Sequence, residues 1–222
     1  MEDTVSNDLR ANFRWQSTAS SSAVLSLSDL KNEAVVERHL TILTNHFGSP
    51  TRAHAASMTA KRAGYAVALL IYARLRYNIV VNSSNCFLMT ADEPSAAPGW
   101  LPVYSFPLNS AESEQDAVNW ITKELYAETL VPIIEVLAKE KGISRAVLFE
   151  NVFVYMKWIF VTKLQDSDLF QQLLETPVSE FGYTKRHPFA YYEDTSNGLR
   201  RTCCLRYQTV GEERTCKACS LK

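Results

Sequence analysis

The chain has 222 residues, a net charge of −1 and an apolar fraction of 46%, as expected for an ordinary soluble globular protein with a substantial core. The balanced charge gives no basic surface of the kind that nucleic acid requires, so we expect no nucleic-acid partner. No apolar run reaches transmembrane length, and the N-terminal sequence lacks the basic start and apolar stretch of a secretory signal. These features predict a cytoplasmic protein, in which thiols stay reduced.

The first part of the chain predicts one helix behind a polar arm. We interpret residues 1–22, which are polar and rich in serine, as a loosely ordered N-terminal arm. Ser28 and Asp29 are suitable N-caps for a helix over residues 30–47 because their side-chain oxygens can accept hydrogen bonds from the first turn.

A second helix is predicted over residues 52–77. Its apolar and small residues are numerous enough for it to be mostly buried. Lys61 and Arg62 interrupt this pattern, and we interpret them as part of a solvated face of the helix, in preference to a ligand site.

Short β-branched or aromatic stretches separated by Asn, Ser, Pro and Gly follow this helix. Such stretches are typical of strands in a small antiparallel sheet, and they lie at residues 78–81, 86–90 and 101–108. Cys86 falls in one of them, and we expect it to be a small buried hydrophobic residue, not a metal ligand.

The second half of the chain returns to helical periodicity. Residues 113–141 predict a helix that Pro132 should kink or interrupt, because proline lacks the N–H that continues the backbone hydrogen-bond pattern. Ser144 caps a long apolar helix predicted over residues 145–164, and a shorter helix follows over residues 167–175.

Helical periodicity is lost after Gly182. The sequence therefore predicts an α+β fold that is mostly helical, with a small central antiparallel sheet and a short irregular C-terminal lobe. We divide it into the arm at residues 1–22, a main domain over residues 23–181 and a C-terminal segment over residues 182–222.

Four of the five cysteines lie in the last twenty residues: Cys203, Cys204, Cys216 and Cys219. Two are adjacent, and after eleven residues the other two form a C-x-x-C pair. A C-x-x-C pair binds soft metals well, because its two thiolates converge on one metal while backbone N–H groups point at the sulfurs. The arginine and lysine residues nearby favour the thiolate form.

Three interpretations of this cluster compete. A [2Fe–2S] cluster tolerates unusual ligand spacing as long as four thiolates reach its two irons. Adjacent cysteines in an extended chain point to opposite sides, so they chelate one tetrahedral zinc only with strain. The reducing compartment and the strain of a vicinal bridge disfavour disulfides. The spacing favours the iron–sulfur cluster over zinc, and zinc over redox thiols or disulfides, and excludes none of them.

The ending "RRTCCLRY…TCKAC" resembles the C-terminal signature of the FhuF-like ferric siderophore reductases, in which a C-C pair, about ten residues and a C-x-x-C pair hold a [2Fe–2S] cluster. Upstream, "GSPTRAHAASMTAKRAGYAVALLIYA" looks like a helical segment of that family. "FENVFVYM" resembles its W-x-N-apolar helix, with Phe149 where tryptophan is frequent. The resemblance is tight over the last twenty residues and loose over most of the remaining chain.

The resemblance implies a cytoplasmic oxidoreductase for iron uptake. Such an enzyme reduces siderophore-bound Fe(III) to Fe(II) by one electron through a [2Fe–2S] cluster on the four C-terminal cysteines. Reduction releases the iron because Fe(II) binds hard oxygen donors more weakly. A separate ferredoxin, flavodoxin or reductase would supply the electron, since the chain has no G-x-G-x-x-G motif, and we allow for peripheral association with the inner face of the membrane. The alternative is a zinc-stabilised, non-redox binding module associated with siderophore metabolism.

No catalytic acid or base is predicted beyond the cluster itself. Cationic residues close to the cysteines in sequence could steer an anionic ferric chelate toward them: Lys185, Arg186, His187, Arg200 and Arg201. The competing interpretation, which we favour for most of these residues, is that they balance the charge of the cluster and pack a small lobe with the neighbouring aromatic residues.

Overall fold

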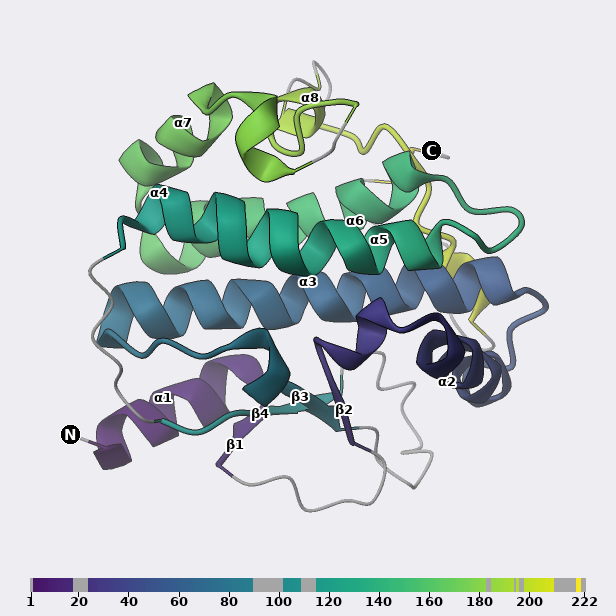
Figure 1. Cartoon of the computed structure of the whole chain (residues 1–222), viewed down its shortest axis with the longest axis horizontal. Helices are drawn as coiled ribbons and strands as arrows, with labels where there is room; N and C mark the ends of the chain where they lie inside the picture. The colour runs from purple at the N-terminus through teal and green to yellow at the C-terminus, as the bar shows by residue number, and fades with distance from the viewer. Residues whose placement is uncertain are drawn as a thin grey trace.

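A computed structural model describes residues 2–17, 24–89, 102–108, 115–182, 185–193, 195, 198–209 and 219–220 of the chain (Figure 1). The α-helices are α1 (Glu2–Phe13), α2 (Glu33–His46), α3 (Arg52–Tyr77), α4 (Ala117–Trp120), α5 (Val131–Leu137), α6 (Arg145–Lys157), α7 (Ser167–Glu175) and α8 (Ala190–Glu193). The 3₁₀ turns are η1 (Asp29–Lys31), η2 (Ser83–Asn85), η5 (Val178–Phe181) and η6 (Arg206–Gln208), and two π-helical segments are η3 (Ile121–Leu130) and η4 (Trp158–Leu164). The strands are β1 (Trp15–Gln16), β2 (Val24–Ser26), β3 (Phe87–Met89) and β4 (Val103–Ser105). The predicted α+β fold, mostly helical with a small sheet, is confirmed.

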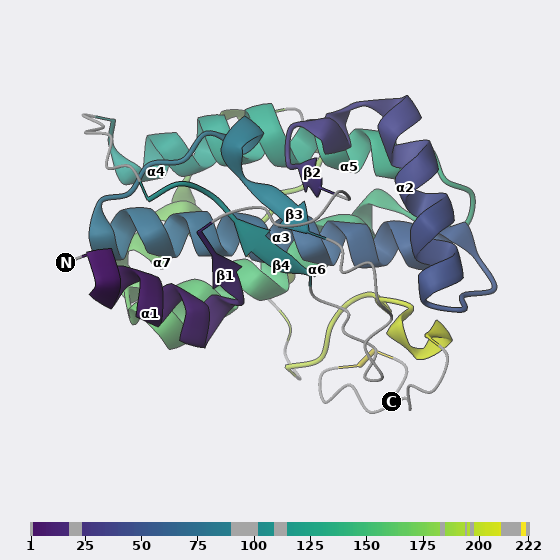
Figure 2. The ribbon, with the colours of Figure 1, turned by 90° about the horizontal axis from the view of Figure 1, so that it is seen from below.

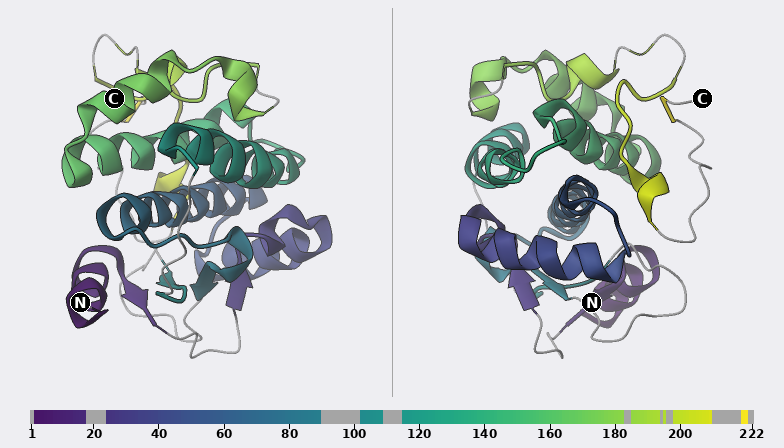
Figure 3. Two further views of the ribbon diagram at one scale, coloured as in Figure 1. Left: turned by 60° about the vertical axis from the view of Figure 1, so that its left-hand side comes forward. Right: turned by 90° about the vertical axis from the view of Figure 1, so that its right-hand side faces the viewer.

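Helix α3 lies at the centre of the molecule, where the right-hand view of Figure 3 looks nearly along its axis. It begins after Thr51, whose hydroxyl accepts a hydrogen bond from the N–H of His54, and ends at Asn78, which has the left-handed φ of 56°. Most of its length is buried, so the predicted helix over residues 52–77 and its burial are both confirmed.

Helices α5 and α6 cover α3 on the side opposite the sheet, and α7 and α8 lie above them (Figure 1). Helix α6 starts after Ser144, whose hydroxyl accepts from Val147 N–H, and η4 continues it to Leu164, as predicted. At Gly64, α3 and α6 approach so closely that a Cβ there would lie 2.8 Å from the Cα of Val152. This close approach fixes how α6 sits against the central helix.

Pro132 does not interrupt the helix predicted over residues 113–141, but the backbone hydrogen-bond pattern changes next to it. The described part runs from α4 through the π-helical η3 into α5, and Pro132 stands in the first turn of α5. Proline cannot donate to the carbonyl four residues earlier, and the wider π-helical turn directly before it accommodates that loss.

The sheet lies along the other side of α3, in the strand order β1-β4-β3-β2 (Figure 2). Strands β2, β3 and β4 pair antiparallel, but β1 pairs parallel to β4, so the purely antiparallel prediction was wrong. The predicted strand at residues 78–81 is not a strand either. Its apolar residues Ile79 and Val81 are buried as irregular chain leaving α3.

The N-terminal arm also differs from the prediction of loose order over residues 1–22. Its described part forms α1 and β1, and Leu9, Phe13 and Trp15 are buried in the main core. The prediction relied on the many polar residues of the arm. These residues include one side of an amphipathic helix, whose apolar side chains pack against α3 and η4. Among the described residues, no helix combines the length and the apolar character needed to cross a membrane.

Candidate metal centre

The C-terminal segment that carries the cysteines packs on the outside of the helical layer (Figures 2 and 3). Its described part comprises residues 198–209 and 219–220, and Cys216 lies outside the described residues. The segment contacts the N-terminal halves of α3 and α6 through buried polar side chains. These contacts decide where the thiols are held.

Ser57 on α3 and Asn151 on α6 form the centre of this polar interface. The Ser57 hydroxyl donates to the backbone carbonyl of Cys204 at 2.7 Å. The Asn151 amide donates to the Ser57 hydroxyl at 2.8 Å, and its carbonyl accepts from Arg200 Nη2 at 2.6 Å. Ser57 and Asn151 are both fully buried, so each hydrogen bond satisfies a group that water cannot reach.

Glu150, the neighbour of Asn151 on α6, anchors the segment directly before the cysteines. Its buried carboxylate accepts from the backbone N–H groups of Arg201 at 2.6 Å and Thr202 at 2.8 Å, and from the Thr202 hydroxyl. The guanidinium of Arg200 lies 3.7 Å from the same carboxylate. A buried carboxylate with these partners fixes the backbone entering Cys203.

A second anchor follows the adjacent cysteines. The Thr209 hydroxyl lies 3.0 Å from Nε2 of His54, and both residues are buried. The Thr51 hydroxyl donates to the side chain of Gln208 at 2.8 Å. The chain on both sides of the cysteine pair is therefore attached to the helical layer.

The backbone turns sharply after the two adjacent cysteines. Leu205 has a φ of 60°, in the left-handed region, and its N–H donates to Cys203 Sγ at 3.4 Å. The N–H of Arg206 hydrogen-bonds to the sulfur of Cys204. Backbone N–H groups directed at cysteine sulfurs are the arrangement that stabilises metal-bound thiolates.

The two adjacent thiols have different neighbours. Cys203 is half-buried, and Cys219, beyond fifteen intervening residues, is among the groups that raise its pKa. Cys204 is 5% exposed, and its sulfur lies 3.2 Å from Nζ of Lys61 on α3. Cys203 and Cys219, from opposite ends of the motif, are thus near enough for one thiol to affect the pKa of the other.

Lys61 and Arg62 are 8% and 3% exposed, so the interpretation as a solvated face was wrong. The Lys61 ammonium group reaches Cys204, and Arg62 packs over the ring of Phe47, with its guanidinium carbon 5.2 Å from the ring centre. Covering by the C-terminal segment and by α2 buries both cations. The sequence of a helix taken by itself does not reveal these partners, which come from other parts of the chain.

The pKa values of the thiols follow from these surroundings. Burial opposes ionisation of Cys204, but the charges of Lys61 and Arg200 and the Arg206 N–H outweigh it, so the Cys204 pKa lies below its usual range. Burial raises the pKa of Cys203, which the Leu205 N–H partly offsets and the neighbouring cysteines increase further. Burial lowers the pKa of Lys61, opposed by the charge of Cys204. The site favours a thiolate at Cys204.

The donor set fits a thiolate-ligated metal group. Soft sulfur donors, N–H groups aimed at two of the sulfurs and a buried cation beside one of them suit an anionic iron–sulfur cluster, and also a zinc site. In the described part of the chain, which lacks Cys216, no group of three or more His, Cys, Asp or Glu side chains is placed to hold a metal ion. Cys86 is fully buried in the core, as predicted, and burial raises its pKa to about 12.

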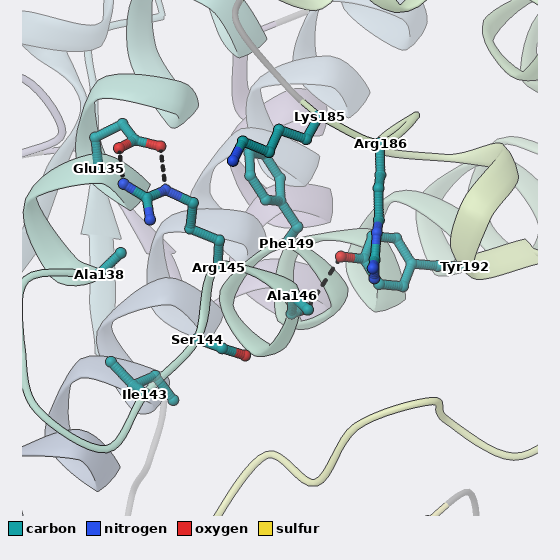
Figure 4. Close-up of a pocket in the computed structure, with 10 residues that line it drawn as sticks. All are labelled: Glu135, Ala138, Ile143, Ser144, Arg145, Ala146, Phe149, Lys185, Arg186 and Tyr192. Atoms are coloured by element: carbon teal, nitrogen blue, oxygen red, sulfur yellow. Dashed lines mark hydrogen bonds and ion pairs between the residues drawn. The ribbon is translucent and has the colours of Figure 1, made fainter.

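The residues predicted to dock the substrate fall into separate places. Lys185 and Arg186 line a pocket of about 680 Å³, together with Arg145, Phe149 and Tyr192 (Figure 4). Arg145 forms a two-point ion pair there with Glu135. The pocket is thus lined by three cationic side chains, one carboxylate and the aromatic rings of Phe149 and Tyr192.

The other three predicted docking residues have structural partners. Nδ1 of His187 accepts from the backbone N–H groups of Phe189 and Ala190, both at 3.0 Å, while Nε2 lies 2.8 Å from the Thr176 carbonyl oxygen. Arg200 binds Asn151, and Arg201 Nε donates to the carbonyl of Tyr191. For these three residues the geometry agrees with the expectation that most of the cations have a structural role.

In the sequence, Asn151 had only a place in the stretch that resembles the W-x-N-apolar helix, and the anchoring roles of Ser57, Glu150 and Asn151 were not predicted. Each is a polar side chain within an otherwise apolar helix, and this departure from pattern was the available signal. No model of a known protein family matches the chain, and no curated protein matches it.

Proposed function

We propose that this protein is a cytoplasmic ferric siderophore reductase, which converts chelated Fe(III) to Fe(II) by one electron through a [2Fe–2S] cluster held by Cys203, Cys204, Cys216 and Cys219. The main observation in support of the proposal is the environment of Cys204: the Lys61 ammonium group and a backbone N–H both contact its sulfur. A positive charge and an N–H donor beside the sulfur stabilise the thiolate form, which is the form that binds a metal or cluster.

The residues around the cysteines have distinct tasks in this proposal. The four thiolates bind the cluster, which when bound supplies the single electron that reduction of one Fe(III) requires. Glu150 and Ser57 hold the backbone on either side of Cys203 and Cys204. The iron leaves its chelator after reduction, because Fe(II) binds the hard oxygen donors of a siderophore less strongly.

For docking we propose the pocket lined by Lys185 and Arg186. Its excess of positive charge attracts carboxylate-bearing or otherwise anionic ferric chelates, and Phe149 offers an apolar surface for their carbon skeleton (Figure 4). The carboxylate Glu150, next to Phe149 on α6, binds the segment that leads to the cysteines. Helix α6 therefore connects the pocket wall to the metal centre.

Stopped-flow mixing tests the reductase activity. Protein reduced with dithionite and freed of excess reductant is mixed with ferric hydroxamate, ferric citrate-type and ferric catecholate siderophores, and the return of the visible absorption is followed. At least one class should oxidise the protein within seconds and yield Fe(II) trapped by ferrozine. Reduced protein that none of the three oxidises contradicts the proposed activity.

The docking pocket is tested by Lys185→Met combined with Arg186→Met. The double variant should raise the chelate concentration for half-maximal oxidation rate about tenfold or more, with the rate at saturation little changed, because the pocket contributes attraction and not the electron. Arg38→Met, which removes an exposed cation of α2 outside the pocket, is the matched control. Equal concentration dependence in both proteins would refute the assignment of the pocket.

A further inference from the structure

Lys61 is an unusual residue for its position in the middle of α3. Lysine is almost never buried without a partner, since removing an ammonium group from water is costly. Lys61 is 8% exposed, and its Nζ lies 3.2 Å from Cys204 Sγ. Its side chain therefore reaches from the central helix to a proposed ligand of the metal centre.

Two cations, Lys61 and Arg200, act on the charge of Cys204. The guanidinium of Arg200 lies 3.7 Å from the Glu150 carboxylate, which offsets its positive charge. The Cys204 sulfur and the cations Arg200 and Arg206 are among the groups that act electrostatically on Lys61. Of these groups, only the Cys204 sulfur can carry a negative charge, and the Lys61 ammonium group lies 3.2 Å from it.

A fixed cation at this distance acts differently on the two oxidation states of a thiolate-ligated cluster. The reduced state carries one more negative charge than the oxidised state, and part of that charge resides on the sulfurs. Attraction by a nearby cation in a water-poor site is therefore greater in the reduced state. Removing the cation should make reduction harder.

We propose that Lys61 is a positioning residue that holds the Cys204 sulfur and, through its positive charge, raises the reduction potential of the cluster. The inference rests on the proposed function, because it requires the [2Fe–2S] cluster. In this proposal, α3 supplies the residue that sets how readily the cluster accepts an electron from an external donor. The cysteine motif, by contrast, only binds the cluster.

The test measures the potential of the loaded protein, independent of any siderophore. Wild-type protein and the variants Lys61→Met, Lys61→Gln and Lys61→Arg are titrated by spectroelectrochemistry, following the visible absorption. The two neutral variants should lower the reduced-to-oxidised equilibrium constant about tenfold or more, which is a shift of about 59 mV to more negative potential for one electron. Lys61→Arg should stay close to wild type, because it keeps the charge.

Lys157→Met is the matched control, since Lys157 is more exposed and pairs with Glu193, away from Cys204. Its potential should equal that of wild type. A neutral Lys61 variant that keeps the cluster at the wild-type potential overturns the inference. Loss of the cluster in both neutral variants but not in Lys61→Arg supports a need for the charge, whereas loss in all three assigns Lys61 a packing role and overturns it.

These outcomes are separate from failure of the proposed reductase. A shifted potential in the neutral variants, together with no oxidation by any ferric siderophore, keeps the role of Lys61 and rejects the activity. A potential that is unchanged in the neutral variants, together with rapid oxidation by a ferric siderophore, keeps the activity and rejects the role of Lys61. Wild-type protein without a [2Fe–2S] cluster overturns both.

Discussion

The two halves of helix α3 are buried to a similar degree but by different chemistry. From Ala66 to Ala73 its side chains are mostly apolar and pack in the main core. Between His54 and Arg62 it buries a histidine, two hydroxyl residues and two cations. The apolar half is stabilised by removal of surface from water, which any residue of suitable shape provides. The polar half requires particular partners, and the segment with the cysteines supplies several of them.

This contrast shows where the site is vulnerable. An apolar contact that loosens loses a graded amount of free energy, whereas a buried polar group that loses its partner leaves a group unsatisfied. Changes at the polar half should therefore disturb the cysteine segment first, and changes at the apolar contacts should lower global stability first.

The largest effect is expected from Glu150→Gln. The change removes the buried charge that binds two backbone N–H groups and faces Arg200, so it should lower the free energy of unfolding by about 3 kcal/mol. Amide hydrogen exchange should increase most within residues 199–204, and cluster binding should weaken. Urea unfolding and exchange detected by mass spectrometry measure both effects.

Glu180→Gln is the control for this prediction, because Glu180 forms an ion pair with Lys123 in which both side chains are more than 40% exposed. Exposed pairs contribute about 0–1 kcal/mol, so this variant should remain close to wild type in both measurements. If Glu150→Gln left the exchange of the cysteine segment unchanged, the anchoring role of Glu150 would be wrong.

A smaller effect concerns acid stability. Burial, followed by the charge of Arg62, lowers the pKa of His39 to about 3, while an unfolded histidine titrates near its model value of 6.5. Below pH 6.5 the unfolded state therefore binds more protons, and stability falls as the pH decreases from 6.5 toward 3. By pH 5 this one residue should have removed about 2 kcal/mol.

His39→Gln should make this loss of stability shallower, since glutamine does not titrate. Urea unfolding of the two proteins between pH 7 and pH 5 measures the difference. A residual slope should remain from His46, His54 and His187, whose pKa values are also lowered, mainly by burial. Parallel pH profiles for the variant and wild type would show that His39 is not buried in its neutral form.

The smallest effect is expected from Gly64→Ala, on the contact between α3 and α6. The new methyl group would lie 2.8 Å from the Val152 Cα, so the helices must move apart. Overpacking of this kind costs about 1–3 kcal/mol, and alanine returns about 1 kcal/mol of helix propensity. We expect a net loss of about 1 kcal/mol in thermal unfolding, and an increase in stability would indicate a looser contact than the structure has.

The contrast between the two halves of α3 also marks what the sequence could predict. Local signals sufficed for the helix over residues 52–77 and for the Ser144 cap, because each depends on neighbours in the chain. Parallel pairing of Trp15 with Tyr104, across 88 intervening residues, has no local signal. The same holds for the burial of Lys61, which depends on Cys204 arriving from the far end of the chain.

The metal content of the purified protein is the decisive measurement for the proposed iron–sulfur cluster. Iron, zinc and acid-labile sulfide are quantified in anaerobically purified wild-type protein and in the variants Cys216→Ser and Cys86→Ser. We expect two irons and two sulfides per chain in wild type and in Cys86→Ser, with a red-brown colour that bleaches with dithionite, and their loss in Cys216→Ser. Colourless wild-type protein with one zinc per chain would contradict it.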